Sequence, residues 1–310
     1  MVEWILNRVG DVLLALLIMV ITIWCLLTQP VLSFSSGNSP ELGMDPELLG
    51  SRILEMASVA ETQADQQSRF DATAAYLSEN LSNAGVVDVA DRGENLHIIH
   101  LQMGSQKKRK LFIGMHYVVT ANQIPEIIRT AVSLVELTNL LAAQDQMNMQ
   151  LDLTIFLHKD DERSQLYETL SDASVYHVDQ LTLKRKADDI GLLFTPGLRI
   201  PDAVYATEQW RYFDLLLPST RTELSIFGRL RDVWQLRYLK VGLNSQGMSS
   251  VNSLSIPVNF PGASDSPLKF YWERDLPVML VRSNALKIKN SYDSYSKFIS
   301  ALFGLIKNGG

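Results

Sequence analysis

The stretch from Leu111 to Val132, LFIGMHYVVTANQIPEIIRTAV, decides how the chain folds. It opens with a short apolar run that ends at His116, continues through a loop and then starts a helix at Pro125. A short apolar run indicates a buried strand, and proline suits the first turn of a helix. The stretch therefore predicts a strand followed by a helix. It also places a histidine at the strand end, a common position for a metal ligand or a catalytic base.

The sequence on both sides continues the alternation of helices and strands. Asp71 as N-cap and Gly85 as C′ residue delimit one predicted helix, and a second runs from about Pro125 to Gln144. The C-terminal stretch 291–308 has apolar side chains at helical spacing, namely Tyr295, Phe298, Leu302 and Ile306.

Strand patterns fill the intervals between these helices. They occur at 96–101, 111–116, 151–158, 190–194, 212–218 and 276–281. We expect the first two to be adjacent strands, with the basic run Lys107–Lys110 as the solvated hairpin turn between them. Alternating strands and helices predict a three-layer α/β fold, in which a mostly parallel twisted sheet is covered by helices on both faces.

The composition excludes several classes of function. The 310-residue chain has 28 basic and 34 acidic residues and a net charge of -6. Nucleic-acid binding requires clustered Lys and Arg, so no nucleic-acid partner is expected. The one cysteine, Cys25, excludes an intrachain disulfide and a zinc site built from cysteines. Because Cys25 lies within an apolar run, a cysteine nucleophile is excluded as well.

An apolar segment near the N-terminus, residues 12–32, has the length of a membrane span. No charged residue occurs between Asp11 and Glu41, and 21 helical residues cover about 31 Å, close to the thickness of a bilayer core. A cleaved signal peptide is the alternative, but the run is longer than the apolar core of a usual signal peptide. We therefore expect a single-pass transmembrane anchor, with the lipid bilayer as a partner of the chain.

Basic residues near the anchor predict its orientation. Arg8 precedes the span and the next basic residue is Arg52, which favours a cytoplasmic N-terminus, residues 1–11. The main domain would then lie outside, on the periplasmic side of a bacterial inner membrane. Residues 33–47 are rich in Ser, Gly and Pro and predict a linker. The remainder, 48–310, is expected to form the α/β domain.

Five stretches within residues 50–306 carry a family resemblance. They are SRFDATAAYLSENLSNAG, ENLHIIHLQMGSQKKRKLFIGMHYVV, PEIIRTAVSLVELTNLL, LDLTIFLHKDDE and SDSPLKFYWERDLPVMLV. Their order and spacing resemble the two-zinc aminopeptidases, whose wider clan includes leucyl aminopeptidase, glutaminyl cyclase, nicastrin and the transferrin receptor ectodomain. The resemblance implies the fold of that family. For active members it also implies two zinc ions bridged by one carboxylate, each held by a histidine and a further carboxylate, with a separate Glu as general base.

Some positions of that centre are kept in this sequence. The first metal-binding histidine of the family motif falls on His116, and the bridging Asp falls on Glu126. The family's Glu-Glu pair falls on Asp161 and Glu162, or on Asp160 and Asp161 if the register shifts by one residue. If the domain is an active enzyme, His116, Glu126 and Glu162 would hold zinc. Asp161 would then act as the catalytic base.

Other positions of the centre are lost. The Asp that orients the first histidine falls on Val118, a ligand Asp falls on Phe194, and the last histidine falls near Lys289. Neither metal keeps three protein ligands, the usual minimum for catalytic zinc, and loss of the orienting carboxylate typically costs about 10- to 100-fold in affinity. We interpret Val118, Phe194 and Lys289 as part of a former cleft. No cofactor is expected, and zinc is expected only for an active enzyme.

The other histidines are not expected to replace the missing ligands. His97 and His100 stand an odd number of residues apart on one strand and therefore face opposite sides of the sheet. His158 and His177 could in principle supply ligands, but each is interpreted as structural or exposed. Without the family pattern, His116 would also be interpreted as a structural histidine at a strand end.

The sequence thus predicts a membrane-anchored, catalytically degenerate aminopeptidase-like domain. Its expected role is that of a non-catalytic recognition or assembly module that binds a protein or a peptide, either as a separate protein or as a subunit of a membrane protein complex. The segment 210–240 is rich in aromatic residues and arginine and suits such an interface, although one strand and one packed helix explain it equally well. The alternative is an active zinc-dependent aminopeptidase with altered metal ligands.

Overall fold

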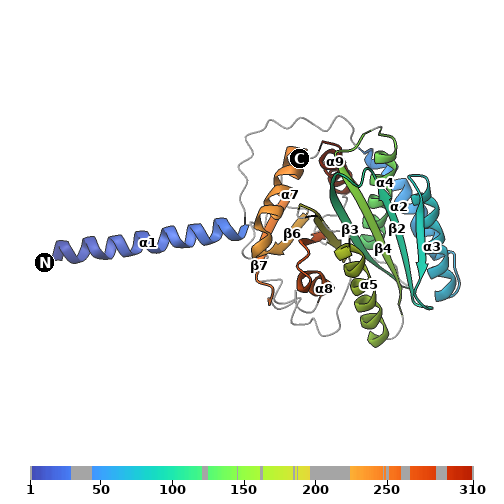
Figure 1. Ribbon diagram of the computed structural model, residues 1–310, viewed down its shortest axis with the longest axis horizontal. Coiled ribbons are helices and arrows are strands. Elements are labelled where there is room, and N and C mark those ends of the chain that lie inside the picture. The colour runs from blue at the N-terminus through green and yellow to red at the C-terminus, as the bar shows by residue number, and fades with distance from the viewer. Residues whose placement is uncertain are drawn as a thin grey trace.

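A single eight-stranded sheet crosses the described part of the chain (Figure 1). The computed structural model describes residues 2–28, 44–120, 125–144, 146–160, 163–183, 186, 188–195, 224–246, 248, 251–259, 266–283 and 292–308. The strands are β1 (Val87–Asp91), β2 (Leu96–Met103), β3 (Arg109–Val119), β4 (Met149–Lys159), β5 (Ile190–Phe194), β6 (Leu224–Arg229), β7 (Val251–Ile256) and β8 (Val278–Ser283).

The strands of this sheet follow the order β1-β2-β4-β3-β5-β8-β6-β7. Four of the neighbouring pairs are parallel, namely β3 with β4, β3 with β5, β5 with β8, and β6 with β7. The other three pairs are antiparallel. The predicted α/β fold with a mostly parallel sheet is therefore confirmed.

Helices cover both faces of the sheet, as predicted. One face packs against α3 (Gln66–Ser82), α4 (Pro125–Ala142) and α9 (Tyr292–Asn308), and α2 (Pro46–Glu61) packs on these three helices. The opposite face packs against α5 (Arg163–Leu183) and the short α8 (Leu268–Glu273). Near β6 and β7, the 3-10 helix η1 (Leu230–Asp232) leads into α7 (Val233–Ser245), which lies beside α9.

Strands β3 and β4 form the centre of the fold and are buried on both faces. Their odd-numbered side chains, such as Ile113 and Leu153, enter the large apolar core beneath α4 and α9. Their even-numbered side chains point toward α5, and these include His116 and His158. Polar groups on this second face are shielded from bulk water and must find partners inside the protein.

The expectation that β2 and β3 are adjacent strands is wrong. Strand β4 lies between them and pairs antiparallel with β2 over its whole length, from Leu96 opposite His158 to Met103 opposite Leu151. Because the crossover through α4 returns the chain beside β3, β4 takes the central place and β2 joins its far side. The run Lys107–Lys110 is not a solvated hairpin either, since β3 begins at Arg109 and Lys110 is only 6% exposed.

Helix α3 begins six residues before the predicted start. Asp65 is its N-cap, and the side chain of Asp65 accepts a hydrogen bond from the backbone N of Ser68 at 2.8 Å. Asp71, the predicted N-cap, lies inside the helix. The C-cap is Asn83, one residue before the position next to Gly85 that was predicted. The earlier start brings Phe70 into the helix, where its ring is completely buried. The other two predicted helices, α4 and α9, agree with their predicted ranges, whereas α2 and α5 were not predicted.

The N-terminal helix α1 (Val2–Thr28) projects away from the rest of the fold (Figure 1). Apolar side chains along it, from Val12 to Trp24, are exposed. Its last described residue is held to the domain, because the carbonyl oxygen of Thr28 accepts hydrogen bonds from Lys240 Nζ at 3.1 Å and Ser253 Oγ at 2.8 Å. Among the described residues, no helix meets the length and apolarity required to cross a membrane.

The described part of the segment 210–240 is built from one strand and one packed helix, β6 and α7, joined by η1. The predicted strand at 212–218 lies outside the described residues. Arg229, at the end of β6, is 1% exposed, so this arginine is internal and does not belong to a surface.

Arg229 links β6 to the turn between α8 and β8. Its guanidinium donates to both carboxylate oxygens of Asp232, at 2.5 and 3.0 Å, and to the backbone oxygens of Trp272 at 2.9 Å and Leu276 at 3.3 Å. Asp232 is also buried. A buried arginine with this many acceptors is well paired, and its removal would leave the Asp232 carboxylate without a cation.

We therefore expect Arg229→Met to destabilise the fold by about 3–5 kcal/mol, the usual cost of leaving one charge of a buried pair unpaired. Urea unfolding of both proteins would measure the change. Arg231→Met is the matched control, because Arg231 is 61% exposed and contacts Asp275 at the surface. Arg231→Met should lower the free energy of unfolding by less than about 1 kcal/mol. Equal losses for the two variants would contradict this account.

Candidate functional site

His116 lies inside the fold, on the side of β3 that faces α5. The strand continues three residues beyond it to Val119, and the side chain is 0% exposed. His116 Nδ1 lies 2.9 Å from His158 Nε2, and His116 Nε2 lies 3.4 Å from Ser174 Oγ. Its ring also stacks on Phe156, with 4.9 Å between ring centroids.

The hydrogen bonds around His116 form a chain with one direction. Ser174 Oγ donates its only proton to the Leu170 carbonyl at 2.7 Å, so it must accept from His116 Nε2. His116 Nδ1 is then bare and accepts from His158 Nε2. His158 Nδ1 in turn faces the Thr169 hydroxyl at 3.3 Å, and this hydroxyl also lies 3.0 Å from the Leu166 carbonyl oxygen. Each nitrogen of both imidazoles has a partner, and both rings are neutral when the Thr169 hydroxyl directs its proton to His158 Nδ1 in place of the Leu166 carbonyl.

Burial keeps these imidazoles neutral. Desolvation, with a contribution from the neighbouring His158, lowers the pKa of His116 well below its ordinary value. Desolvation also lowers the pKa of His158 to about 3 and that of His177 to about 4. A proton on any of the three would be a charge without solvent around it.

The residues aligned with zinc ligands do not converge on His116. Phe194 pairs with Met115 in the sheet and packs edge to face on Phe298, with ring centroids 5.8 Å apart, so it faces the side opposite His116. Val118 shares the face of His116 but is apolar and 7% exposed. Glu126 stands half-buried in the first turn of α4.

Other predicted positions lie at or beyond the edge of the described chain. Asp160 follows β4, is exposed, and donates its backbone N–H to the Val119 carbonyl at 3.1 Å. Asp161, Glu162 and Lys289 lie outside the described residues, so their roles remain predictions. Among the residues that the structure does describe, no three His, Cys, Asp or Glu side chains are placed to hold a metal ion.

The described donors do not fit a two-zinc centre. Both nitrogens of His116 are used within the protein, its neighbours on the same face include Val118 and Phe156, and Phe194 points away. A catalytic zinc needs three protein ligands and an open position for water or substrate. His116 is 0% exposed and offers no such position.

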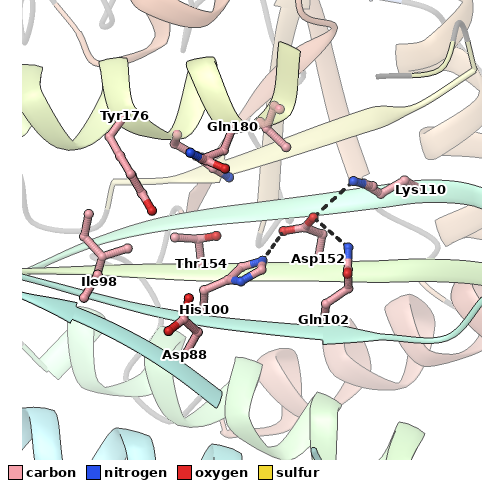
Figure 2. Close-up of a pocket in the computed structure, with 12 residues that line it drawn as sticks. Asp88, Ile98, His100, Gln102, Lys110, Asp152, Thr154, Tyr176 and Gln180 are labelled. Atoms are coloured by element: carbon pink, nitrogen blue, oxygen red, sulfur yellow. Dashed lines mark hydrogen bonds and ion pairs between the residues drawn. The ribbon is translucent and has the colours of Figure 1, made fainter. Parts of the chain in front are cut away.

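A polar pocket lies on the same face of the sheet, toward the other end of β4 (Figure 2). Its volume is about 190 Å³. Strands β1 to β4 form one side and α5 covers the other, with Tyr176 and Gln180 directed toward the strands (Figure 2). The polar residues that line it are Asp88, His100, Gln102, Lys110, Asp152, Thr154, Tyr176, His177 and Gln180.

Asp152 organises this pocket. One carboxylate oxygen lies 3.0 Å from His100 Nε2, and the other lies 3.2 Å from Lys110 Nζ and 3.4 Å from Gln102 Nε2 (Figure 2). Burial by itself would raise the pKa of Asp152, but the hydrogen bond from His100 and the charges of His100 and Lys110 outweigh it and lower the pKa to about 2. The pocket therefore contains a buried, ionised carboxylate that is paired with an ammonium group.

His177 borders the pocket from α5. Its Nδ1 lies 2.8 Å from the hydroxyl of Tyr271, and its ring lies over Gly114 on β3, where an added Cβ would come within 3.4 Å of the imidazole. The tighter contact of such a Cβ would be with Leu193 Cδ1 at 3.1 Å, so the glycine at this position accommodates Leu193 more than His177. As expected from their spacing, His97 and His100 face opposite sides: His97 stacks on Phe70 of α3, whereas His100 enters the pocket.

Sequence reasoning missed this pocket. A signal was present in β4, where Gln150, Asp152, Thr154 and His158 alternate with apolar residues in a strand that is buried throughout. The side chains that meet Asp152 come from β2 and β3, and finding them requires knowing that β4 lies between these strands.

Known structures share this fold. No protein-family model matches the sequence, and no curated protein matches it. A leucine aminopeptidase precursor from Bacteroides thetaiotaomicron superposes with a TM-score of 0.54 at 10% identity, covering 86% of this chain and 98% of its own. Glutaminyl cyclase from the same species, bound to N-acetylhistamine, gives 0.52 at 10% identity, with 86% and 99% covered.

The LapA aminopeptidase from Legionella pneumophila gives a TM-score of 0.52 at 11% identity, with 84% of this chain and 71% of that one covered. At this identity the likeness concerns the fold alone. The chain has the fold of zinc-dependent exopeptidases, as its resemblance to the two-zinc aminopeptidases predicts.

The buried histidines predict how stability depends on pH. Below about pH 6.5 the unfolded chain protonates His116, His158 and His177, whereas the folded chain keeps them neutral. These histidines therefore contribute fully to the free energy of unfolding above about pH 6.5. Their contribution declines as the pH falls, by up to about 1.4 kcal/mol per pH unit for each histidine. Urea unfolding at pH 7, 6 and 5 should show this decline, and His158→Gln should reduce its slope. A flat profile would contradict the assignment.

Proposed function

We propose that this chain is a membrane-anchored recognition or assembly module with an aminopeptidase-like fold that does not catalyse peptide hydrolysis. The observation that carries the proposal is the complete burial of His116, with hydrogen-bond partners at both ring nitrogens. In the family that the sequence resembles, this histidine would bind zinc beside an open coordination position. Here the same position serves packing and hydrogen bonding.

The apolar residues at aligned positions support the same conclusion. Phe194 contributes to the core with Phe298, and Val118 stands where an acidic residue would orient the histidine. Replacing carboxylates by packed apolar side chains removes ligands and also stabilises the core that takes their place. The alternative, an active aminopeptidase with altered ligands, would need Asp161 and Glu162 to supply ligands, because the described residues alone bring no three candidate ligands together.

Exposed apolar side chains support a role in binding a protein or peptide. On and beside α7, Trp234 is 75% exposed, Leu230 45% and Val241 42%. Arg231, next to Leu230, is exposed as well. Exposed tryptophan with nearby arginine is typical of the residues that contribute most to protein interfaces. A partner protein or a peptide is therefore the proposed ligand of the module, either in isolation or within a membrane complex.

Membrane attachment through residues 12–32 is part of the proposal. The exposed apolar side chains of α1 would be costly in water and stable in a lipid environment. The proposed span continues four residues past Thr28, where the described helix ends. The hydrogen bonds from Lys240 and Ser253 to Thr28 would hold the domain close to the membrane surface. The proposed location is the periplasmic side of a bacterial inner membrane.

Metal analysis tests the absence of a catalytic centre. The full chain, purified in detergent and dialysed against buffer with trace zinc, is expected to retain well below one zinc per chain and to leave leucine p-nitroanilide intact. Glu162→Gln is the control, because trace zinc that is unchanged in this variant is adventitious. Near-stoichiometric zinc that Glu162→Gln removes, together with hydrolysis, would establish the active-enzyme alternative.

Fractionation tests the anchor. The full chain should remain with the membranes through a carbonate wash and enter solution only with detergent. Leu17→Arg with Ile21→Arg should release it, since each arginine at the centre of a span costs about 2.5–3.5 kcal/mol on insertion. The matched control, Leu17→Ala with Ile21→Ala, should remain bound. A wild-type chain found in the soluble fraction would refute the anchor.

A further inference from the structure

The pocket around Asp152 is a separate site from the histidines at His116 and His158. The ring of Phe156 lies between the two, stacked on His116 at 4.9 Å and edge to face with His177 at 5.2 Å. A ligand in the pocket would not touch His116, so its binding is independent of whether the domain is catalytic.

The pocket has a buried inner end and an accessible rim. At the inner end, Lys110 and Asp152 are each 6% exposed, Thr154 is 2% exposed and His177 is 3% exposed. Asp88 and Gln180 are exposed at the rim, and Tyr176 and His100 are partly exposed there. A molecule entering from solvent would first meet the rim and then place one end among the buried polar groups.

One buried atom at the inner end lacks a partner. His177 Nε2 makes no hydrogen bond within the described part of the chain, although its side chain is almost fully buried. Tyr271 is buried too, and the hydrogen bond that the structure gives its hydroxyl is the one to His177 Nδ1. The Tyr271 hydroxyl has an acceptor for its proton if His177 Nδ1 is the bare nitrogen of the imidazole. A neutral imidazole with a bare Nδ1 carries its own proton on Nε2. A buried N–H without an acceptor indicates a missing partner.

Lys110 adds further donors at the same end. Of its three N–H groups, one is directed to Asp152 Oδ2 at 3.2 Å. The carboxylate of Asp152 is already occupied by His100, Gln102 and Lys110. The inner end thus has more donors than acceptors, and a ligand must present an oxygen or another acceptor to it.

The charges of the lining argue against an ionic ligand. Lys110 compensates Asp152, and Asp88, which lies opposite His100 in the sheet, compensates a proton on that imidazole or otherwise adds one negative charge at the rim. An anion would find no uncompensated positive charge, while a cation would meet the donors of Lys110 and His177 at the inner end. The remaining groups, Gln102, Thr154, Tyr176 and Gln180, are uncharged and can both donate and accept.

We propose that this pocket binds a small uncharged, hydroxyl-rich molecule, a monosaccharide unit or a cyclic polyol, with one ligand oxygen accepting from His177 Nε2 and Lys110 Nζ. Hydroxyl groups donate and accept in turn, which matches the mixed lining at the rim. Tyr176 supplies an aromatic side chain beside the path of entry (Figure 2). The volume of about 190 Å³ agrees with this size, because a cavity of about 150 Å³ holds a six-membered benzene ring.

Saturation-transfer NMR on the full chain, in a detergent without a sugar headgroup, tests the proposal. The probes are D-glucose, D-galactose and myo-inositol, with propionate as the anionic and ethylammonium as the cationic comparison. At least one uncharged probe should receive saturation, and the two ions should not. The same probe should shift the His177 signals in a long-range ¹H–¹⁵N spectrum of histidine-labelled protein, assigned with the His177→Gln variant.

Variants locate the binding. His177→Phe keeps a ring but removes the donor, and should weaken binding at least about tenfold, the effect of losing one buried hydrogen bond to a ligand. His177→Gln should bind more tightly than His177→Phe, because the glutamine amide can take the place of Nε2–H. Gln180→Ala, at the exposed rim, should fold normally and weaken binding, whereas Gln67→Ala, an exposed glutamine on α3, should not.

Three results would overturn the proposal. The first is that none of the uncharged probes shifts the His177 signals. The second is that propionate or ethylammonium shifts them instead, which would assign the pocket to a charged ligand. The third is that Gln180→Ala and Gln67→Ala bind the best probe equally well, which would place the binding elsewhere on the protein.

Discussion

The position of β4 between β2 and β3 is the constraint on which the rest of the structure depends. A strand with neighbours on both sides and helices on both faces has no contact with bulk water, and ten of the eleven residues of β4 are buried. Its polar residues on the α5 side must then be paired inside the protein. Asp152 is paired with His100 and Lys110, and His158 is paired with His116. Both polar clusters of this face follow from that requirement.

The two clusters satisfy the requirement in different ways, and their functional potential differs accordingly. Around His116 and His158, the hydroxyls of Ser174 and Thr169 lie at the two ends of a chain of hydrogen bonds. Each imidazole nitrogen in this chain has a partner among the described residues. Around Asp152 a cavity of about 190 Å³ remains, and His177 Nε2 beside it has no partner in the described part of the chain. The strand position that the resemblance aligns with a metal-binding histidine is therefore buried, and the cavity lies elsewhere on the same face.

The fold was predictable because its signals are local. Apolar runs and helical spacing within single segments identify β3, β4, β5, α4 and α9, and their alternation predicts a parallel sheet. The order of the strands was not predictable in the same way. Strand β2 pairs with β4, and the two strands are separated by about fifty residues of sequence that contain β3 and α4. The error at Lys110 has the same origin: a basic run looks solvated until the partner, Asp152, is known to lie on the next strand. Asp71 was predicted as the cap of α3 from local pattern alone, whereas the structure caps this helix at Asp65 and thereby includes the buried Phe70.

The surroundings of His116 also show why a family motif alone does not determine chemistry. A histidine on this strand can become a metal ligand or a core residue, and the choice depends on residues far away in the sequence, here Ser174 and His158. In a metal centre, the bound ion stabilises the folded state by mass action. In this chain, burial keeps the imidazoles of His116 and His158 from their charged form, so the expected linkage is to protons. We therefore expect the stability of this fold to respond to acid, whereas the stability of a metal centre at the same strand position would respond to the metal.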